Sequence, residues 1–409
     1  MPLFLSLVPR DEAWRRLEGY LKEGPHRVET VGLLQALGRV LAEEVVSPVD
    51  VPGFSRSTVD GYAVRACDTF GATEVLPALL VLAGEVRMGE RPGFALRPQQ
   101  CARIATGAML PKGADAVVMV ETAEEMDEAT VVVARPVAPG ENVVGASEDV
   151  ARGDILLRRG LRLRPHDLAA LAAVGISDVR VAARPAVAII STGDELVDVS
   201  DPPAPGKVRD MNSYSLYAAT LAAGATPIMG GIVKDDRDAL ARAMSELLRG
   251  ADMLVVSGGS SVGSRDFVRD AIDSLGKPGV LVHGVAVKPG KPTILAVADG
   301  KPVFGLPGHP VSCLTIFRLF VEPSIARWMG ATLQTREVEA RLGANVASVA
   351  GREDYIGVRL SLRDGAIWAD PVFSKSALIS GLVLSDGVAR IPAEVEGVEK
   401  GESVTVTIV

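Results

Sequence analysis

The chain has 409 residues, which at about 150 residues per domain suggests two to four domains. Its composition is 48% hydrophobic and 23% charged, so the chain can build large cores and wholesale disorder is disfavoured. The net charge of −8 and the aromatic content of 4% argue against a nucleic-acid partner, which would require a basic face and stacking side chains.

The cysteines and the N-terminal segment bear on the compartment. Cys67, Cys101 and Cys313 are far apart and form no CxxC motif, which argues against a disulfide framework or a zinc site and favours a reducing compartment. The N-terminal segment lacks the basic region and cleavage site of a signal peptide, and no apolar run reaches the about 18 residues of a membrane span. We therefore expect a cytoplasmic protein without a membrane partner.

The first half of the chain combines helical and β segments. Asp11 can cap a first helix, we expect helical structure from about residue 10 to residue 50, and Pro165 opens an Ala/Leu-rich helix. Short apolar runs separated by turns lie between these helical segments and predict strands. We predict an N-terminal elongated α+β domain over 1–50 and 147–183, interrupted by an inserted β domain over 51–146.

Residues 184–330 alternate strands with helices. Continuous apolar runs such as AVAIIST and MLVVSGG predict buried strands, and DRDALARAMSELLRG has the apolar spacing of a helix. This alternation is typical of a three-layer α/β domain with a mostly parallel sheet covered on both faces.

Two other stretches have a clear local character. The Pro-, Gly- and Ser-rich residues 46–65 predict a loop. In 331–409 apolar residues alternate with polar ones, as in Val404, Val406 and Ile408, which predicts a small C-terminal β domain, either a sandwich or a barrel.

Oxygen-rich and basic segments follow the predicted strands of the α/β domain, where ligands bind in open parallel sheets. These residues are Glu195, Asp235, Ser257, Gly258, Gly259, Ser260, Ser261, Asp266, Lys288, Lys291, Pro292, Pro307 and Pro310. Small residues let the backbone approach a phosphate, lysines neutralise it, and carboxylates can hold Mg²⁺. Each segment alone is also explained as a turn or a helix cap, but their convergence on one edge favours a site. No P-loop or GxGxxG motif occurs there, so neither an ATPase nor a Rossmann cofactor site is supported.

Several motifs in one order carry a resemblance to a known family. They are PGFSRSTVDGYAVR, RIATGAMLPKGADAVVMVE, STGDEL, SGGSSVGSRDF, VAVKPGKP, GLPGHPVS and SDGVARIP. The chain resembles the molybdopterin molybdenumtransferase family, the MoeA and gephyrin E-domain proteins, nearly end to end. The resemblance implies elongated homodimers of four domains, in which the α/β domain is similar to molybdopterin adenylyltransferase and the last domain is barrel-like.

The resemblance also implies a reaction. Such proteins bind adenylyl-molybdopterin and molybdate, insert the metal at the dithiolene, and release AMP in a Mg²⁺-dependent step. The physical logic agrees, because cleavage of a phosphoanhydride and binding of a dianion both require neutralising cations. Molybdopterin adenylyltransferase and molybdoenzymes are the further partners that it implies.

The resemblance assigns roles residue by residue. Lys288, Lys291 and Pro292 match molybdate and phosphate contacts, while Ser261 and Asp266 match a substrate and Mg²⁺ position. The other matched positions are Glu195, Asp235, Pro307 and Pro310 in the α/β domain, Asp60, Thr106 and Asp149 in the second domain, and Ser376 in the last. We expect Glu195 and Asp266 to hold the metal, and the second domain to close over the partner's site.

Three positions depart from the family pattern. His309 stands where an asparagine is common, Gly284 replaces a basic residue, and Gly357 replaces an arginine. Arg359 could substitute for that arginine, because residues two apart in a strand point to the same face.

Two other functions remain open at this point. The chain could be a molybdopterin-binding scaffold or carrier without catalysis, but a pure anion binder gains nothing from the carboxylates Glu195, Asp235 and Asp266. It could instead catalyse the molybdopterin adenylyltransferase step, although the extra N- and C-terminal blocks favour the later step. Molybdate and tungstate are not distinguished by these residues.

Overall fold

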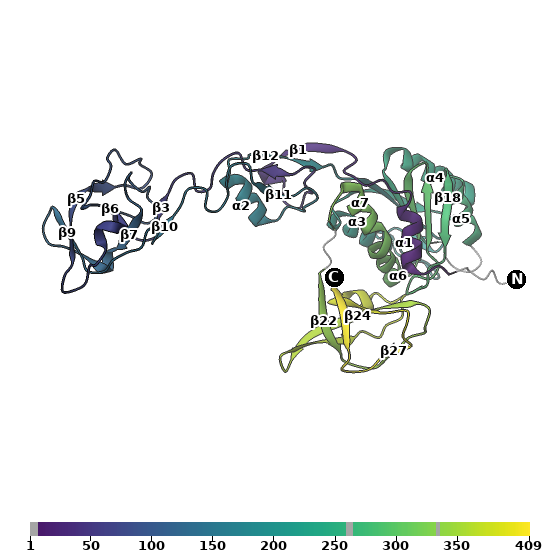
Figure 1. The fold of residues 1–409 in the computed structure, drawn as a ribbon. Helices are drawn as coiled ribbons and strands as arrows, with labels where there is room; N and C mark the ends of the chain where they lie inside the picture. Colours follow the sequence, from purple (N-terminus) through teal and green to yellow (C-terminus); the bar gives the residue numbers. More distant parts are fainter. Residues whose placement is uncertain (1–6, 259–264, 333–335) are drawn as a thin grey trace.

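The computed structural model describes residues 7–258, 265–332 and 336–409, with only the backbone described for Arg265 and Asp266. Figure 1 shows an elongated molecule in which the inserted β sheet lies at one end and the α/β layers lie at the other. A narrow middle segment joins them, and the C-terminal β domain packs beside the α/β layers. In the described part of the chain, no helix has the length and apolarity needed to cross a bilayer.

A six-stranded sheet forms the centre of the α/β domain, in the order β16-β13-β17-β21-β20-β18. The strands are β13 (Ala186–Thr192), β16 (Thr226–Val233), β17 (Met253–Gly258), β18 (Pro278–His283), β20 (Ile294–Ala298) and β21 (Lys301–Leu306). Four neighbours, β16, β13, β17 and β21, are parallel, whereas β20 runs antiparallel to β21 and β18. The predicted three-layer α/β domain with a mostly parallel sheet is confirmed.

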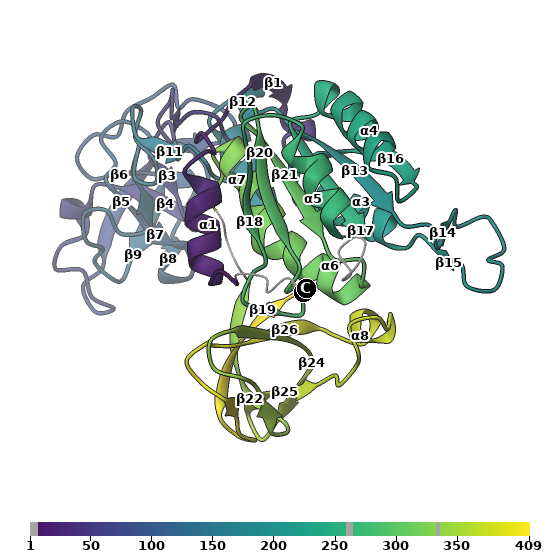
Figure 2. The same cartoon turned by 90° about the vertical axis from the view of Figure 1, so that its right-hand side faces the viewer.

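Helices cover both faces of this sheet (Figure 2). They are α3 (Asn212–Ala222), α4 (Arg237–Gly250), α5 (Arg265–Asp273), α6 (Pro310–Ile316) and α7 (Glu322–Met329), with a π-helical segment (Phe317–Val321) between the last two. Alternate residues of β13 point to opposite faces, so Ile189 packs with α3, α6 and α7 while Ile190 packs with α4 and α5. Full burial of each such side chain contributes about 1.5–3 kcal/mol.

The first helix packs on this sheet as well. Helix α1 (Arg10–Glu18) buries Ala13 and Leu17 against the same core as Phe304. The predicted helix is therefore present, but it lies against the α/β layers rather than in the elongated domain to which 1–50 were assigned. The apolar side chains of α1 pack against the core of the α/β domain, which presents a larger apolar surface than the core of the narrow middle segment.

The middle segment consists of short paired strands and one helix. The strands are β1 (Val28–Gly32) with β12 (Asp178–Ala182) and β2 (Val45–Val46) with β11 (Ile155–Leu157), and the helix is α2 (Pro165–Ala173). Helix α2 is confirmed, and Asp167 closes its first turn by accepting the Arg164 N–H. The expectation of helix up to residue 50 is wrong. Residues 28–32 find strand partners about 150 positions further along the chain, a pairing that local periodicity does not reveal.

The inserted domain is built on a second six-stranded sheet, in the order β7-β4-β6-β5-β9-β8. Its strands are β4 (Gly61–Val64), β5 (Ala78–Val86), β6 (Gln100–Ile104), β7 (Ala116–Met119), β8 (Ala123–Glu125) and β9 (Thr130–Val133), with β3 (Arg56–Ser57) paired to β10 (Val143–Val144). The predicted all-β character is confirmed. Strand β4 lies inside residues 46–65, so the predicted loop is wrong for this part. Pairing with β6 and β7 buries β4 and stabilises a strand in a stretch that is rich in glycine, proline and serine.

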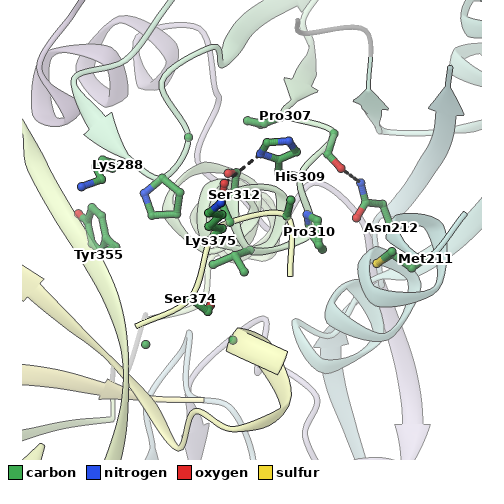
Figure 3. Close-up of a pocket in the computed structure, with 18 of the residues that line it drawn as sticks. Met211, Asn212, Lys288, Pro307, His309, Pro310, Ser312, Tyr355, Ser374 and Lys375 are labelled. Carbon is green, nitrogen blue, oxygen red and sulfur yellow. Dashed lines mark hydrogen bonds between the residues drawn. The ribbon is translucent and has the colours of Figure 1, made fainter. Parts of the chain in front are cut away.

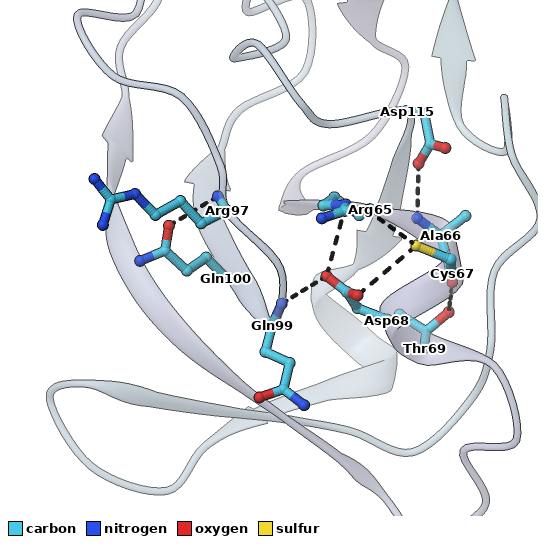
Figure 4. Close-up of polar contacts among 9 residues, drawn as sticks. All are labelled: Arg65, Ala66, Cys67, Asp68, Thr69, Arg97, Gln99, Gln100 and Asp115. Carbon is cyan, nitrogen blue, oxygen red and sulfur yellow. Dashed lines mark hydrogen bonds and ion pairs between the residues drawn. The ribbon is translucent and has the colours of Figure 1, made fainter.

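Side chains fix the turns of this domain (Figure 4). Asp68 accepts the backbone N–H of Gln99 at 2.7 Å, and Asp115 accepts that of Ala66 at 2.6 Å. Gln99 has a φ of +61°, so this hydrogen bond holds a residue in the left-handed region.

One carboxylate predicts a pH dependence of stability. Glu125 accepts hydrogen bonds from Arg103 Nε at 2.7 Å and from the Tyr62 hydroxyl at 2.5 Å, and these contacts lower the pKa of Glu125 from 4.5 to about 2. A lowered folded-state pKa stabilises the fold above the unfolded-state pKa, and that contribution disappears as the pH falls from about 4.5 to about 2. Glu125→Gln should therefore lower the Tm at pH 7 by more than Glu128→Gln does, and the difference should vanish near pH 2. Thermal denaturation between pH 2 and pH 7 measures it, and a difference independent of pH would contradict the assignment.

The last domain is a closed barrel. Its strands are β19 (Val287–Lys288), β22 (Glu337–Leu342), β24 (Glu353–Arg363), β25 (Ala366–Pro371), β26 (Gly387–Ile391) and β28 (Ser403–Ile408), with the ribbon β23 (Val346–Ala347) and β27 (Gly397–Val398) and the short helix α8 (Ser380–Val383). Pairing of β24 with both β25 and β26 closes the ring. Of the two predicted architectures, the barrel is thus the one formed. Strand β19 comes from the α/β segment of the chain, so the barrel and the α/β domain share a strand pairing.

Candidate active site

A cavity of ≈ 1150 Å³ lies between the carboxyl edge of the α/β sheet and the barrel. Its α/β side is formed by the last residue of β17 and by the segments that follow β13 and β21, and its other side by β24, the segment after β25, and α8. Glu195, Gly258, Lys288, Pro292, Pro307, Pro310 and Ser376 are the predicted site residues that line it. The sheet edge at which the sequence predicts a site is the edge at which the cavity lies.

Glu195 reaches the cavity from the turn after β13. Its backbone carbonyl accepts the Val208 N–H at 2.9 Å, which pairs the short strands β14 (Leu196–Val197) and β15 (Val208–Arg209). A Cβ on Gly193 would lie 2.7 Å from Glu195 Oε2, so the carboxylate occupies the space that this glycine leaves open. Glu195 is therefore an exposed carboxylate held at the cavity by backbone contacts.

Asn212, which the sequence analysis did not single out, holds the floor of the cavity together. Its side-chain amide donates to Ser257 Oγ and to the Gly308 carbonyl, both at 2.8 Å. Figure 3 shows the second of these bonds. These two bonds tie the end of β17 to the loop before α6. Ser257 itself is buried behind this amide, and Cys313, whose thiol pKa burial raises to about 12, lies 3.7 Å from its hydroxyl. Cys313 is a core residue.

Lys288 borders the cavity beside the barrel. Its ammonium lies 3.5 Å from the carboxylate of Asp354, which is only 2% exposed and also pairs with Arg352 at 2.9 Å. The strand pairing sets this contact, because Lys288 and Asp354 are register partners in β19 and β24. The adjacent Tyr355 donates to Glu353, and its burial together with that bond raises the pKa of the hydroxyl.

Lys291 does not line the cavity, although it lies three residues after Lys288. The turn between them requires Gly290, which has a φ of +125° and whose Cβ would lie 2.4 Å from Ile316 Cδ1. This close packing directs the chain so that Lys288 borders the cavity while Lys291 lies exposed outside the lining. A shared pocket for the two lysines stays a prediction.

Residues 307–312, which comprise the loop before α6 and the first turn of α6, meet the barrel across the cavity. The His309 ring nitrogen Nδ1 and Ser376 Oγ are hydrogen bonded at 2.9 Å, and the Val311 N–H donates to the Ser376 carbonyl at 3.3 Å (Figure 3). The histidine that departs from the family pattern thus contacts the predicted serine of the last domain directly.

The other predicted residues lie elsewhere. Asp235 lies near the same sheet edge, where it accepts the Thr192 hydroxyl at 2.9 Å, but it does not line the cavity. Asp60 and Thr106 belong to the inserted domain at the far end of the molecule and contact each other, with the Thr106 N–H at 2.8 Å from Asp60 Oδ1. These contacts lower the pKa of Asp60. Asp149 is exposed near the same domain.

Part of the predicted site lies outside the described residues. This holds for Gly259, Ser260 and Ser261, and for the side chain of Asp266.

The departures at two glycines have structural reasons. A Cβ on Gly357 would lie 2.3 Å from Ser385 Oγ, so this position of β24 leaves no room for a side chain. Gly284 is buried with a φ of +106°, and its carbonyl accepts the Val8 N–H. Arg359 does not replace a side chain at 357, because it lies further along β24 opposite Asp370 and outside the lining.

The donor set at the cavity can be compared with the needs of Mg²⁺. Within the described ranges no group of three or more His, Cys, Asp or Glu side chains could hold a metal ion. Mg²⁺, however, is commonly bound by one or two carboxylates together with substrate phosphates. Glu195 supplies one such carboxylate at the cavity, so a magnesium ion shared with a phosphorylated ligand fits the residues present.

A cavity at the carboxyl edge of a parallel sheet, bordered by lysines and closed by a second domain, is typical of a protein that binds an anionic small molecule. The family models for the MoeA N-terminal region (domain I and II), a probable molybdopterin binding domain, and the MoeA C-terminal region (domain IV) match residues 8–175, 188–327 and 339–409. The chain is 36% identical to the molybdopterin molybdenumtransferase of Bacillus subtilis, over 98% of this chain and 94% of that one. It is 39% identical to the enzyme of the same name from Nostoc, over 82% and 78% of the two chains.

Solved structures agree with this assignment. The crystal structure of the molybdopterin biosynthesis MoeA protein from Pyrococcus horikoshii OT3 aligns with a TM-score of 0.87 at 34% identity, over 99% of this chain and 100% of that chain. The chain therefore belongs to the MoeA family of molybdopterin molybdenumtransferases.

Proposed function

We propose that this protein acts in molybdenum cofactor biosynthesis and inserts the metal of molybdate into adenylyl-molybdopterin, with Mg²⁺-dependent release of AMP. The observation that carries the proposal is the position of the cavity. It lies in the segment that matches a molybdopterin-binding domain, and the C-terminal barrel of the same family closes it.

The residues at the cavity suit each part of this reaction. Lys288 can neutralise an oxygen of molybdate or of the phosphoanhydride, because its exposed ammonium remains reachable beside Asp354. Cleavage of the phosphoanhydride by water leaves a new negative charge on the departing AMP phosphate, which a fixed cation stabilises. Glu195, with Asp266 as a second predicted ligand, would hold the magnesium ion, which when bound neutralises phosphate charge.

The proposal is tested by following AMP under two conditions. Purified protein with adenylyl-molybdopterin, molybdate and Mg²⁺ should release AMP and yield molybdenum cofactor, whereas ATP with molybdopterin should yield no adenylylated product. Binding of adenylyl-molybdopterin without AMP release would favour a carrier, and adenylylation from ATP would favour the earlier step.

We further propose a homodimer whose sites each combine two chains. Within one chain, Asp60, Thr106 and Asp149 lie in or near the inserted domain, away from the cavity, and a second chain is a direct way to bring them to it. Light scattering should give a mass of two chains. A monomer with full activity would contradict this arrangement.

Mixed variants test the shared site directly. The experiment uses a ligand concentration at which Asp149→Ala and Lys288→Ala chains each show little activity. When the two chains are exchanged, half of the dimers are mixed and each has one intact site, so about a quarter of the wild-type activity should return. Exchange of Lys288→Ala with Glu195→Gln is the matched control, because both residues border the same cavity, and it should restore nothing. Equal recovery in both mixtures would contradict a shared site.

A further inference from the structure

Residues 372–377, here called the strap, connect β25 to α8 and run along the cavity. At its start, the Val372 N–H donates to the Gly357 carbonyl of β24 at 2.8 Å. Near its end, Ser376 bonds to His309 and accepts the Val311 N–H. The strap is therefore fixed to the barrel at one end and to the α/β domain at the other.

Close packing also fixes the strap laterally. A Cβ on Gly381 of α8 would lie 2.1 Å from Ser374 Oγ, so α8 approaches the strap as closely as a glycine allows. The Leu378 N–H donates to the Lys375 carbonyl at 2.9 Å. The backbone of Lys375 is thus held in place, and its exposed side chain borders the cavity (Figure 3).

The cations that line the cavity differ in their partners. Lys288 pairs with Asp354, and Arg209 donates to the Val199 carbonyl at 3.0 Å. The Lys375 ammonium has neither a hydrogen bond nor an ion pair to any residue that the structure describes. Among the residues that the structure describes, none neutralises this charge, so we treat it as available to an anion in the cavity.

We infer that Lys375 is a binding residue that holds a tetrahedral oxyanion group of the ligand, either a phosphate or molybdate, from the barrel side of the cavity. This inference rests on the proposed function and adds a contact to it. Ser376 is held by His309, and Lys288 on β19 is paired with Asp354. The neighbouring Lys375 therefore supplies a second positive charge on the barrel side, one that pairs with none of the described residues. A surface lysine without such a role would affect anion binding no more than any other lysine of the barrel.

Calorimetric titration with three probes tests the inference: molybdate alone, inorganic phosphate alone, and AMP. Lys375→Ala should weaken binding of the oxyanion that it contacts by about tenfold or more, the loss expected for a hydrogen bond to a charged group. Lys375→Arg should retain most of the affinity, and the loss should shrink as salt rises because the site is open to solvent. Lys400→Ala, an exposed barrel lysine outside the lining, is the matched control.

The three probes separate the sources of the oxyanion. A loss for molybdate alone identifies a molybdate contact, and a loss for phosphate and AMP identifies a phosphate contact. Equal affinities of Lys375→Ala and Lys400→Ala for every probe would overturn the inference, as would a wild-type chain that binds none of them. The proposed reaction is judged separately, because wild-type release of AMP from adenylyl-molybdopterin does not depend on the outcome at Lys375.

Discussion

Glu195→Gln and Asp266→Asn are each expected to slow AMP release by on the order of 10²-fold or more while changing substrate affinity little. A carboxylate that holds a metal ion against the reacting phosphates acts mainly in the transition state, so its loss lowers kcat rather than raising KM. Glutamine keeps the size of the Glu195 side chain, so the turn over Gly193 should remain intact. Steady-state AMP release as a function of Mg²⁺ concentration measures the effect.

Glu246→Gln is the control for this prediction. Glu246 is an exposed carboxylate on α4, away from the cavity lining, and its replacement removes one charge without touching the site. Wild-type turnover in Glu195→Gln would mean that Glu195 serves only the turn in which it lies. Wild-type turnover in Asp266→Asn would mean that Asp266 serves only as a carboxylate at the start of a helix.

Lys288→Ala is expected to weaken binding of molybdate or of the substrate phosphates by about 1.5–3 kcal/mol, the range for a hydrogen bond to a charged group. The same substitution removes one partner of buried Asp354, which keeps Arg352 at 2.9 Å, so a smaller loss of thermal stability should accompany it. Titration of each ligand, with a melting curve on the same samples, separates the two effects.

Lys291→Ala is the variant to compare with Lys288→Ala, because both lysines lie in the same turn. Both lysines were predicted to serve the site, but only Lys288 borders the cavity in one chain. We expect a smaller loss of affinity for Lys291→Ala than for Lys288→Ala. An equal loss would indicate that both ammonium groups reach the ligand when it is bound, and no loss in either variant would mean that this loop is only a turn.

Local sequence patterns were sufficient to predict most of the α/β domain. The strand β13 is apolar on both faces, and α4 carries Leu240, Met244 and Leu248 on the face that it buries, so each element could be recognised from its own residues. The residues that follow the strands could be placed at one sheet edge because parallel strands end together. Strand β1 could not be found in this way, since its partner β12 is distant in the chain and its own five residues carry no clear period.

The contribution of the barrel to the cavity was largely missed for a related reason. Asp354, Tyr355 and Lys375 reach the cavity only because the barrel docks against α6 and pairs its strand β24 with β19. Nothing in a period-two strand pattern indicates such docking. The Glu353-Asp354 pair at the start of β24 is the sequence feature that could have indicated a contact there. Carboxylates that are buried require partners, and both of these are buried.

The most direct measurement compares two products of one incubation: the AMP released and the molybdenum bound to the pterin. The protein is incubated with adenylyl-molybdopterin and Mg²⁺, once with molybdate and once without it. If this cavity inserts the metal as it cleaves the phosphoanhydride, the two products should appear in equal amounts, and Glu195→Gln and Lys288→Ala should reduce both together. AMP release without metal insertion, or metal insertion that neither variant slows, would contradict the proposed reaction at this cavity.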